Sequence, residues 1–208
     1  MENIQAIQTH YKGYHFRSRL EARWGIFLDS LGENMRDEGY KPYLPQIEWQ
    51  YEPEGFKLSS GLFYLPDFYL TTFDCWAEVK GSEPTKEERY KCERLGYDTG
   101  KPVILLVGTP GDNHPEIFVS NVCDSNGGEN WFYFLFGYQE DYTPTIEILD
   151  GRDRDYYGPG FQDKCKNIIG RYVPYPSRLE YCSEPCDPTY ENTATREARS
   201  ARFEFGAE

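Results

Sequence analysis

The stretch YLPDFYLTTFDCWAEVKG, residues 64–81, decides the fold because its alternating pattern predicts two strands joined by a tight turn. We place the strands at 66–71 and 74–80, with the turn centred near Thr72 and Phe73. Phe68 then faces Ala77 across the hairpin, and one face of the hairpin is apolar. The opposite face bears Asp67, Glu78 and Lys80, which a purely structural hairpin does not need.

Two of these side chains, Asp67 and Glu78, are expected to face each other. Directly opposed residues have Cβ atoms about 5 Å apart, so the two carboxylates repel unless a proton or a cation lies between them. We predict that both hold Mg²⁺ or Mn²⁺, with the carbonyl of Val79 as a further ligand. Lys80 would then orient or deprotonate the attacking water, or stabilise charge on a phosphate, in phosphodiester hydrolysis. The alternative is a half-exposed hairpin whose two acids are solvated and neutralised by Lys80.

The flanking segments predict an α/β fold with a mixed sheet. Apolar residues at three- and four-residue steps predict a helix over 14–31, which Gly32 would end. Alternation predicts a strand over 47–52, and residues 82–100 are typical of a helix that Ser82 would cap. The continuous apolar run at 102–108 predicts a strand buried on both faces.

Several motifs together resemble the PD-(D/E)xK nuclease superfamily, whose fold is restriction-endonuclease-like. The first is Pro66-Asp67 followed by Glu78-Val79-Lys80. In addition, FRSRLEARW (16–24), YEPEGF (51–56), YLPDF (64–68), EVKG (78–81) and the tail ARSARFE (198–204) resemble small phage-type nuclease proteins and, more distantly, transposon-encoded endonucleases. The resemblance covers residues 11–110 and the tail. It implies a core of helix, three antiparallel strands, helix and strand, and a metal-dependent DNA endonuclease that leaves a 5′-phosphate.

The same resemblance suggests supporting residues on the two helices. It implies that Glu21 faces the metal, whereas spacing alone also allows an i,i+4 pair with Arg17. The neighbouring Arg17, Arg19 and Arg23 would bind phosphates, or else form a solvated helix face. Lys91, on the second helix, falls where such nucleases place a polar active-site helper.

Other chemistry-bearing residues give weaker signals. Cys182 and Cys186 form one loose pair, and the histidines are His10, His15 and His114, so the evidence for structural zinc is weak. Trp76 and Tyr69 would either stack a base beside the metal or pack beneath the first helix.

The net charge of −13 is unevenly distributed, and nucleic-acid binding usually requires a basic surface. Residues 1–110 carry a net charge of −4, and residues 111–208 carry −9. We therefore predict a nuclease core at 1–110 and an acidic, aromatic-rich extension at 111–208 that packs on the core and ends in a helix near 192–205. The predicted partners are DNA and a basic protein that docks on the acidic half. The alternative function is an acidic interaction or inhibitor protein that mimics DNA.

The chain carries no membrane or export signal that we recognise. No apolar run approaches the roughly 18 residues of a membrane span, and the first residues lack the apolar core of a signal peptide. We therefore expect a cytoplasmic protein, in the host cell if it is phage encoded, with its six cysteines as thiols.

Overall fold

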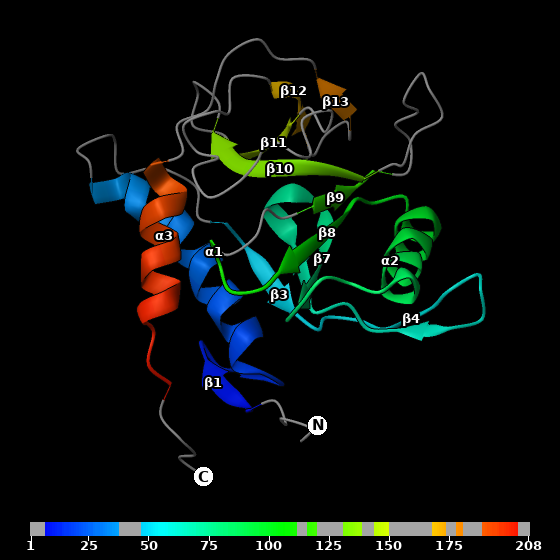
Figure 1. Cartoon of the computed structure of the whole chain (residues 1–208), viewed down its shortest axis with the longest axis horizontal. Coiled ribbons are helices and arrows are strands. Elements are labelled where there is room, and N and C mark those ends of the chain that lie inside the picture. Colours follow the sequence, from blue (N-terminus) through cyan, green and yellow to red (C-terminus); the bar gives the residue numbers. More distant parts are fainter. Residues whose placement is uncertain are drawn as a thin grey trace.

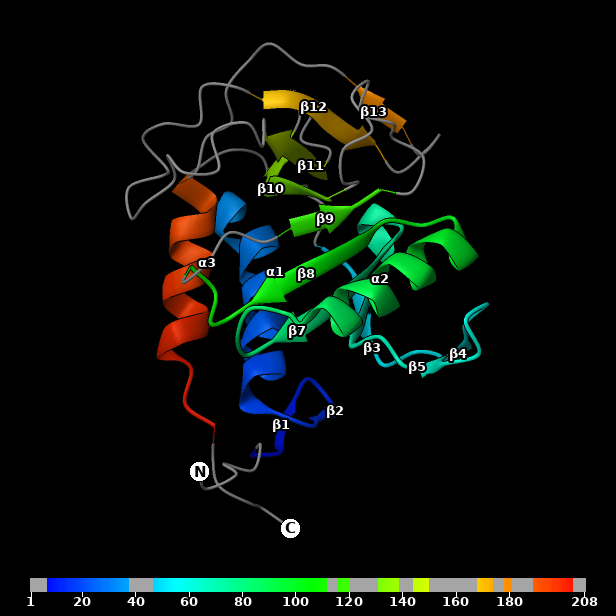
Figure 2. The same ribbon diagram turned by 45° about the vertical axis from the view of Figure 1, so that its right-hand side comes forward.

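The protein is a mixed α/β structure in which helices flank a mixed sheet (Figures 1 and 2), as seen in a computed structural model. The structure describes residues 7–37, 47–111, 116–119, 131–138, 144–149, 168–173, 178–180 and 189–203. Within these residues, no helix is long and apolar enough to cross a membrane.

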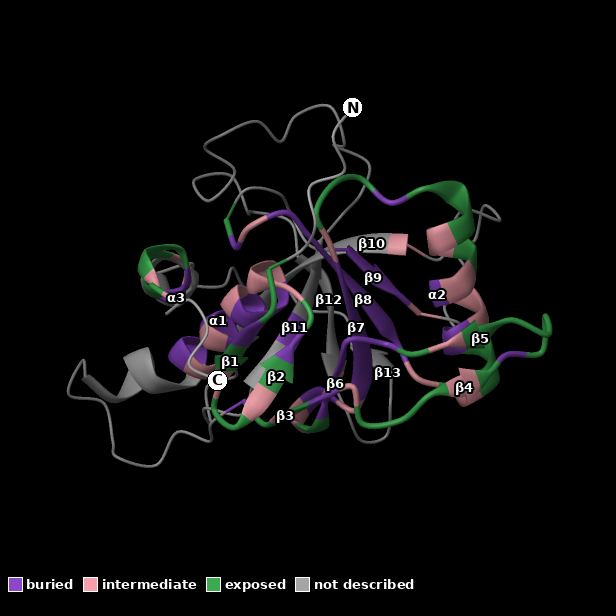
Figure 3. Ribbon diagram, turned by 90° about the horizontal axis from the view of Figure 1, so that it is seen from below, coloured by how far each residue is buried: buried purple, intermediate pink, exposed green. Residues whose placement is uncertain are grey.

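In the part of the chain that the structure describes, the main sheet has nine strands in the order β13-β12-β11-β10-β9-β8-β7-β6-β3. Their bounds are β3 Trp49–Tyr51, β6 Phe68–Leu70, β7 Cys75–Lys80, β8 Val103–Val107, β9 Glu116–Phe118, β10 Trp131–Tyr138, β11 Pro144–Leu149, β12 Ile168–Val173 and β13 Arg178–Glu180. Only the pair β7–β8 is parallel, and the helix α2 (Lys86–Thr99) makes that crossover. Figure 3 shows β7 and β8 buried across the middle of the molecule.

The central hairpin has the predicted register. Phe68 pairs with Ala77 and Leu70 pairs with Cys75, across a 3₁₀ turn at Thr71–Phe73. The apolar face of the hairpin belongs to the core cluster that also contains the buried residues of the first helix. The predicted sorting of the hairpin into two faces is therefore confirmed.

The first helix, α1, spans Arg19–Asp37, so the predicted helix at 14–31 is wrong at both ends. Tyr14–Phe16 is instead the strand β2, which pairs with β1 (Thr9–Tyr11). The cause is the two-residue turn at Lys12 and Gly13, which both adopt positive φ and favour a tight hairpin. At the other end, α1 continues through Gly32.

The second helix begins differently from the prediction. Thr85, rather than Ser82, is the N-cap, because its side chain and that of Glu88 form a reciprocal capping box. Gly100 ends the helix in the left-handed conformation. Gly96 lets α2 approach β9 closely, because a Cβ there would lie 2.7 Å from the ring of Phe118.

A small hairpin lies outside the main sheet. It consists of β4 (Phe56–Lys57) and β5 (Phe63–Tyr64), which pair only with each other. Leu58 of this hairpin is buried with residues of α2 and β8, and the ring of Phe56 packs edge-on against Trp76 at 5.0 Å. The hairpin is therefore anchored on the same face of the sheet as α2.

The last helix, α3 (Thr189–Ser200), packs beside α1, as Figures 1 and 2 both show. Ala194 and Ala198 are fully buried there and belong to the core cluster of α1. This confirms the helical tail, shifted toward the N-terminus. The division of the chain near residue 110 stays a prediction, although β8, before it, pairs directly with β9, after it.

Candidate active site

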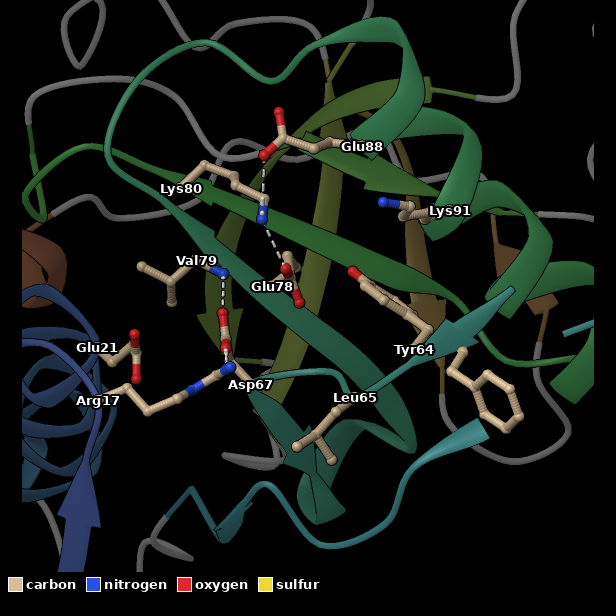
Figure 4. A pocket seen from close by; sticks show the side chains of 11 residues that line it. Arg17, Glu21, Tyr64, Leu65, Asp67, Glu78, Val79, Lys80, Glu88 and Lys91 are labelled. Atoms are coloured by element: carbon tan, nitrogen blue, oxygen red, sulfur yellow. Dashed lines mark hydrogen bonds and ion pairs between the residues drawn. The ribbon is translucent and has the colours of Figure 1, made fainter. Parts of the chain in front are cut away.

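A cavity of about 460 Å³ lies where β7 ends, between the N-terminal end of α1 and the helix α2 (Figure 4). It is lined by Arg17, Glu21, Phe63, Tyr64, Leu65, Asp67, Glu78, Val79, Lys80, Glu88 and Lys91. These residues come from four separate parts of the chain, which the sheet and the two helices bring together.

Asp67 lies at the floor of this cavity and is only 3% exposed. Its Oδ2 accepts a hydrogen bond of 2.8 Å from the backbone N–H of Val79, on the neighbouring strand. Its Oδ1 accepts one of 2.6 Å from Nη2 of Arg17, and Nε of Arg17 lies 2.5 Å from Oε1 of Glu52. Both carboxylate oxygens of Asp67 thus accept hydrogen bonds. Arg17, which was predicted to bind phosphate, is paired with Asp67 and Glu52.

Glu78 is the second carboxylate of the floor and is 5% exposed. Its Oε1 lies 2.8 Å from Nζ of Lys80, which is also 3.3 Å from Oε1 of Glu88. Oε2 of Glu78 is buried and has no hydrogen-bond partner among the residues that the structure describes. An unsatisfied buried carboxylate oxygen is costly, so this atom has the capacity to bind a cation.

The electrostatics of the floor reflect crowded negative charge. Burial, and then the charge of Glu78, raise the pKa of Asp67 to about 8, against the opposing effects of the Val79 N–H and Arg17. Burial acts to lower the pKa of Lys80, but Glu78 and Glu88 outweigh it, so its pKa lies above the usual value. The structure therefore contains an ammonium group beside an acid pair that takes up a proton near neutral pH.

Glu21 also lines the cavity. Its hydrogen-bond partners are not the residue that its sequence spacing suggested. Its Oε1 accepts a 2.7 Å hydrogen bond from the hydroxyl of Ser18, and its Oε2 accepts one from the hydroxyl of Tyr51. Arg17 precedes the helix, so an i,i+4 helical pair with Glu21 does not form. Tyr51 and Ser18 orient a carboxylate that is 8% exposed.

Most of the predicted site residues meet at this cavity, but two do not. Arg17, Glu21, Asp67, Glu78, Val79, Lys80 and Lys91 all line it, whereas Arg19 and Arg23 do not. Arg23 instead donates hydrogen bonds of 2.7 Å to the carbonyl oxygens of Ala198 and Arg199, at the end of α3. The structure therefore gives Arg23 a contact that links α1 to α3, and phosphate binding by Arg23 stays a prediction.

Sequence reasoning missed Glu88 and the run of Phe63, Tyr64 and Leu65. The capping-box pattern at Thr85 and Glu88 was readable, but the contact between Glu88 and Lys80 depends on how α2 packs on the sheet. The three residues from Phe63 belong to the segment that leads into Asp67, and their place in the cavity follows from the separate β4–β5 hairpin.

The aromatic pair of the hairpin does not line this cavity. Trp76 is buried in a cluster with Cys92 and Leu95 of α2, and Tyr69 packs against it with ring centroids 4.7 Å apart. Both therefore lie on the α2 face of the sheet. The expectation that they pack beneath the first helix is wrong, because the period of two sends them to the opposite face.

The floor suits a hard divalent cation better than zinc. Asp67 and Glu78 provide oxygen ligands, and Mg²⁺ typically takes one or two carboxylates and completes its shell with water and phosphate oxygens. Among the residues the structure describes, no group of three or more His, Cys, Asp or Glu is arranged to hold a metal. His10 and His15 stack on each other at 4.5 Å, and Cys182, Cys186 and His114 lie outside the described residues.

No protein-family model, curated protein or solved structure significantly matches this chain.

Proposed function

We propose that the protein is a Mg²⁺- or Mn²⁺-dependent DNA endonuclease of the PD-(D/E)xK type. The observation that carries the proposal is the buried pair Asp67 and Glu78, joined to Lys80 in one cavity. Burying two acids beside each other is unfavourable without a proton or a cation between them. A catalytic metal site gives this arrangement a purpose that a structural hairpin lacks.

Each residue has a role that its contacts support. Asp67 and Glu78 would hold the cation, with Val79 and Glu21 completing its surroundings. A bound Mg²⁺ would supply charge stabilisation at the attacked phosphate. Glu78 and Glu88 keep Lys80 protonated. Lys80 would therefore act as a positioned cation that orients water or stabilises phosphate charge, rather than as a general base. Arg17 and Lys91 would bind the flanking phosphates only by exchanging their present acid partners, which are Glu52 and Asp67 for Arg17 and Glu87 for Lys91.

The arrangement of elements supports the same proposal. The helix α1 is followed by β3, β6 and β7, which pair antiparallel, and then by α2 and the parallel strand β8. We infer that these elements are a restriction-endonuclease-like core, with β4–β5 inserted between β3 and β6. Asp67 and Glu78 then lie at the end of the β6–β7 hairpin that is farther from its turn.

The test is cleavage of plasmid and linear DNA with Mg²⁺, with Mn²⁺ and with EDTA. We expect Asp67→Ala, Glu78→Ala and Lys80→Ala each to lose at least about a hundredfold in rate, the scale of one catalytic group. Lys86→Ala is the matched control, because Lys86 is exposed and does not line the cavity. Wild-type cleavage by Lys80→Ala would contradict the assignment, and EDTA-resistant cleavage would exclude a divalent metal.

The second candidate is an acidic interaction or inhibitor protein, which the net charge of −9 on residues 111–208 favours. Such a protein would bind a basic partner and cleave nothing. It has no need for the ion pair between Lys80 and Glu78. Metal-independent binding to a basic DNA-binding protein, without any cleavage, would favour this candidate.

A further inference from the structure

One side of the cavity is apolar and open to solvent. Phe63 and Leu65 line it, and they are 80% and 39% exposed. Glu88 and Lys91, from α2, line the opposite side (Figure 4). The cavity therefore combines an ionic floor with an apolar rim that is formed by the segment leading into Asp67.

The outward position of Phe63 follows from how its hairpin is anchored. The next residue, Tyr64, points inward, and its hydroxyl lies 3.3 Å from Sγ of Cys92. The backbone N–H of Ser59 donates a 2.6 Å hydrogen bond to Asp98, at the end of α2. Because successive side chains of a strand point to opposite sides, these anchors leave the ring of Phe63 in solvent. Such exposure forgoes the hydrophobic stabilisation that burial of a Phe ring gives.

We propose that Phe63, supported by Leu65, is a stacking platform for an unpaired nucleobase of a nucleic acid whose backbone lies in the cavity. This inference rests on the proposed function of the same site. Arg17, Lys80 and Lys91 line the cavity, each paired with an acid, so a phosphate that enters would share these cations with their present partners. The base attached to a neighbouring sugar then lies at the rim, where an aromatic ring is free to receive it.

The platform implies a substrate class. Inside a duplex, both faces of a base are covered by its neighbours, so only an unpaired or extruded base offers a face to an aromatic side chain. We therefore expect preference for single-stranded DNA, or for duplexes with an unpaired nucleotide near the cleaved bond, over intact duplex.

A single base fits this rim better than a protein partner does. Of the residues that line the cavity, the exposed large apolar ones are Phe63 and Leu65, and the exposed Leu62 precedes them on the same hairpin. A stable protein interface needs about 800 Å² on each partner, which is far more than three side chains offer. The rim is also continuous with the charged cavity, and a nucleotide has both an apolar base and a charged phosphate.

Binding in EDTA tests the platform without any metal-dependent turnover. Anisotropy of labelled single strands and duplexes of the same sequence would be compared for wild type, Phe63→Ala, Phe63→Leu and Phe63→Trp. We expect Phe63→Ala to bind the single strand about fivefold to a hundredfold more weakly, the range for one stacked base. Phe63→Leu should lose as much, Phe63→Trp should bind at least as well as wild type, and duplex binding should change little.

The control variant is Leu62→Ala, because Leu62 is exposed on the same hairpin and does not line the cavity. It should bind single strands as wild type does. In addition, 2-aminopurine in the strand should lose fluorescence on stacking with wild type and with Phe63→Trp, and less with Phe63→Ala.

Three results would overturn the inference. These are wild-type binding by Phe63→Leu, equal losses on single strand and duplex, and an oligomer that Phe63→Ala converts to monomer in sedimentation, which would make the ring a contact between two copies. The result is also separable from the nuclease proposal. Metal-dependent cleavage by wild type, with unchanged single-strand binding by Phe63→Ala, would reject the platform alone. Ring-dependent binding without cleavage would reject the nuclease alone.

Discussion

At the scale of single residues, the paired acids of the floor make stability depend on pH. Without metal, folded Asp67 keeps its proton up to about pH 8, whereas in the unfolded chain it ionises near pH 4. Between these values the folded state binds more protons. The free energy of unfolding therefore falls as pH rises through this window, by up to about 1.4 kcal/mol per unit, and the loss ends above about pH 8.

Asp67→Asn should remove this dependence. In EDTA, the variant should melt at a higher temperature than wild type above about pH 8, and its melting temperature should fall less between about pH 5 and 8. Differential scanning fluorimetry across pH measures both effects. Asp98→Asn is the control, because Asp98 is exposed and its pKa lies below the usual value, so it does not titrate in this window. Parallel curves for wild type and Asp67→Asn would refute the assigned pKa.

The proposed metal site predicts an effect of added Mg²⁺ that depends on Asp67. Mg²⁺ should raise the melting temperature of wild type more than that of Asp67→Asn, since a ligand stabilises only the state that binds it. The shift should be larger near pH 8.5 than near pH 6, because the cation competes with the proton on Asp67. Equal shifts in both proteins at both pH values would place the cation elsewhere.

At the scale of elements, α1 depends on α3 for its position. The guanidinium of Arg23 bonds two carbonyls at the C-terminal end of α3, where the helix dipole is negative, and lies 5.7 Å from the ring of Phe203. The indole N–H of Trp24 donates a 2.9 Å hydrogen bond to the carbonyl of Gly108. These contacts hold the helix that carries Glu21 against the end of β8.

Arg23→Ala should loosen α3 and destabilise the protein by about 1–3 kcal/mol, because it removes two hydrogen bonds from a charged donor. Limited proteolysis should cut near the tail sooner, and chemical denaturation gives the stability change. Arg196→Ala, at an exposed position of α3, should behave as wild type. An unchanged cleavage pattern for Arg23→Ala would mean that the buried alanines alone hold α3.

Local patterns explain which elements the sequence predicted. The register of β6 and β7 was predictable because a period of two sorts Phe68, Ala77 and Glu78 within a few residues. The strand at Tyr14–Phe16 was not, because three residues fit a helical period as well as an alternating one, and only the turn at Lys12 and Gly13 decides between them.

The site shows the same division between local and long-range information. Asp67, Glu78 and Lys80 share a hairpin, so their meeting was predictable. The partners that fix them are distant in the chain, as the contacts of Tyr51 with Glu21 and of Glu88 with Lys80 show. Such contacts depend on how helices pack on the sheet, which periodicity does not encode.

At the scale of the whole molecule, the acidity of residues 111–208 should oppose binding to a DNA backbone, most strongly at low salt, where screening is weak. Replacing Asp150, Asp153 and Asp155 with lysine tests this in a segment that lies outside the described residues. We expect tighter duplex binding at low salt and an effect that shrinks as salt rises.

The measurement is anisotropy of labelled duplex across a salt series, in EDTA. Replacing the same three aspartates with asparagine is the intermediate control, and it should give about half of the change. Unchanged affinity at every ionic strength would place this segment away from the DNA path, and its acidity would then fit a basic protein partner.

The packing of α3 on α1 also has a consequence for biosynthesis. Arg23 meets Ala198 across 175 positions of the chain, so the contact forms only after the residues between them have been translated. At about 5–20 residues per second, the nascent chain spends on the order of ten seconds or more with α1 unsupported by α3. A ribosome-bound or prematurely terminated product would therefore expose the face of α1 that α3 covers, including Arg23. Such fragments should be prone to degradation, because the face of α1 that packs on Ala194 and Ala198 is then open to solvent.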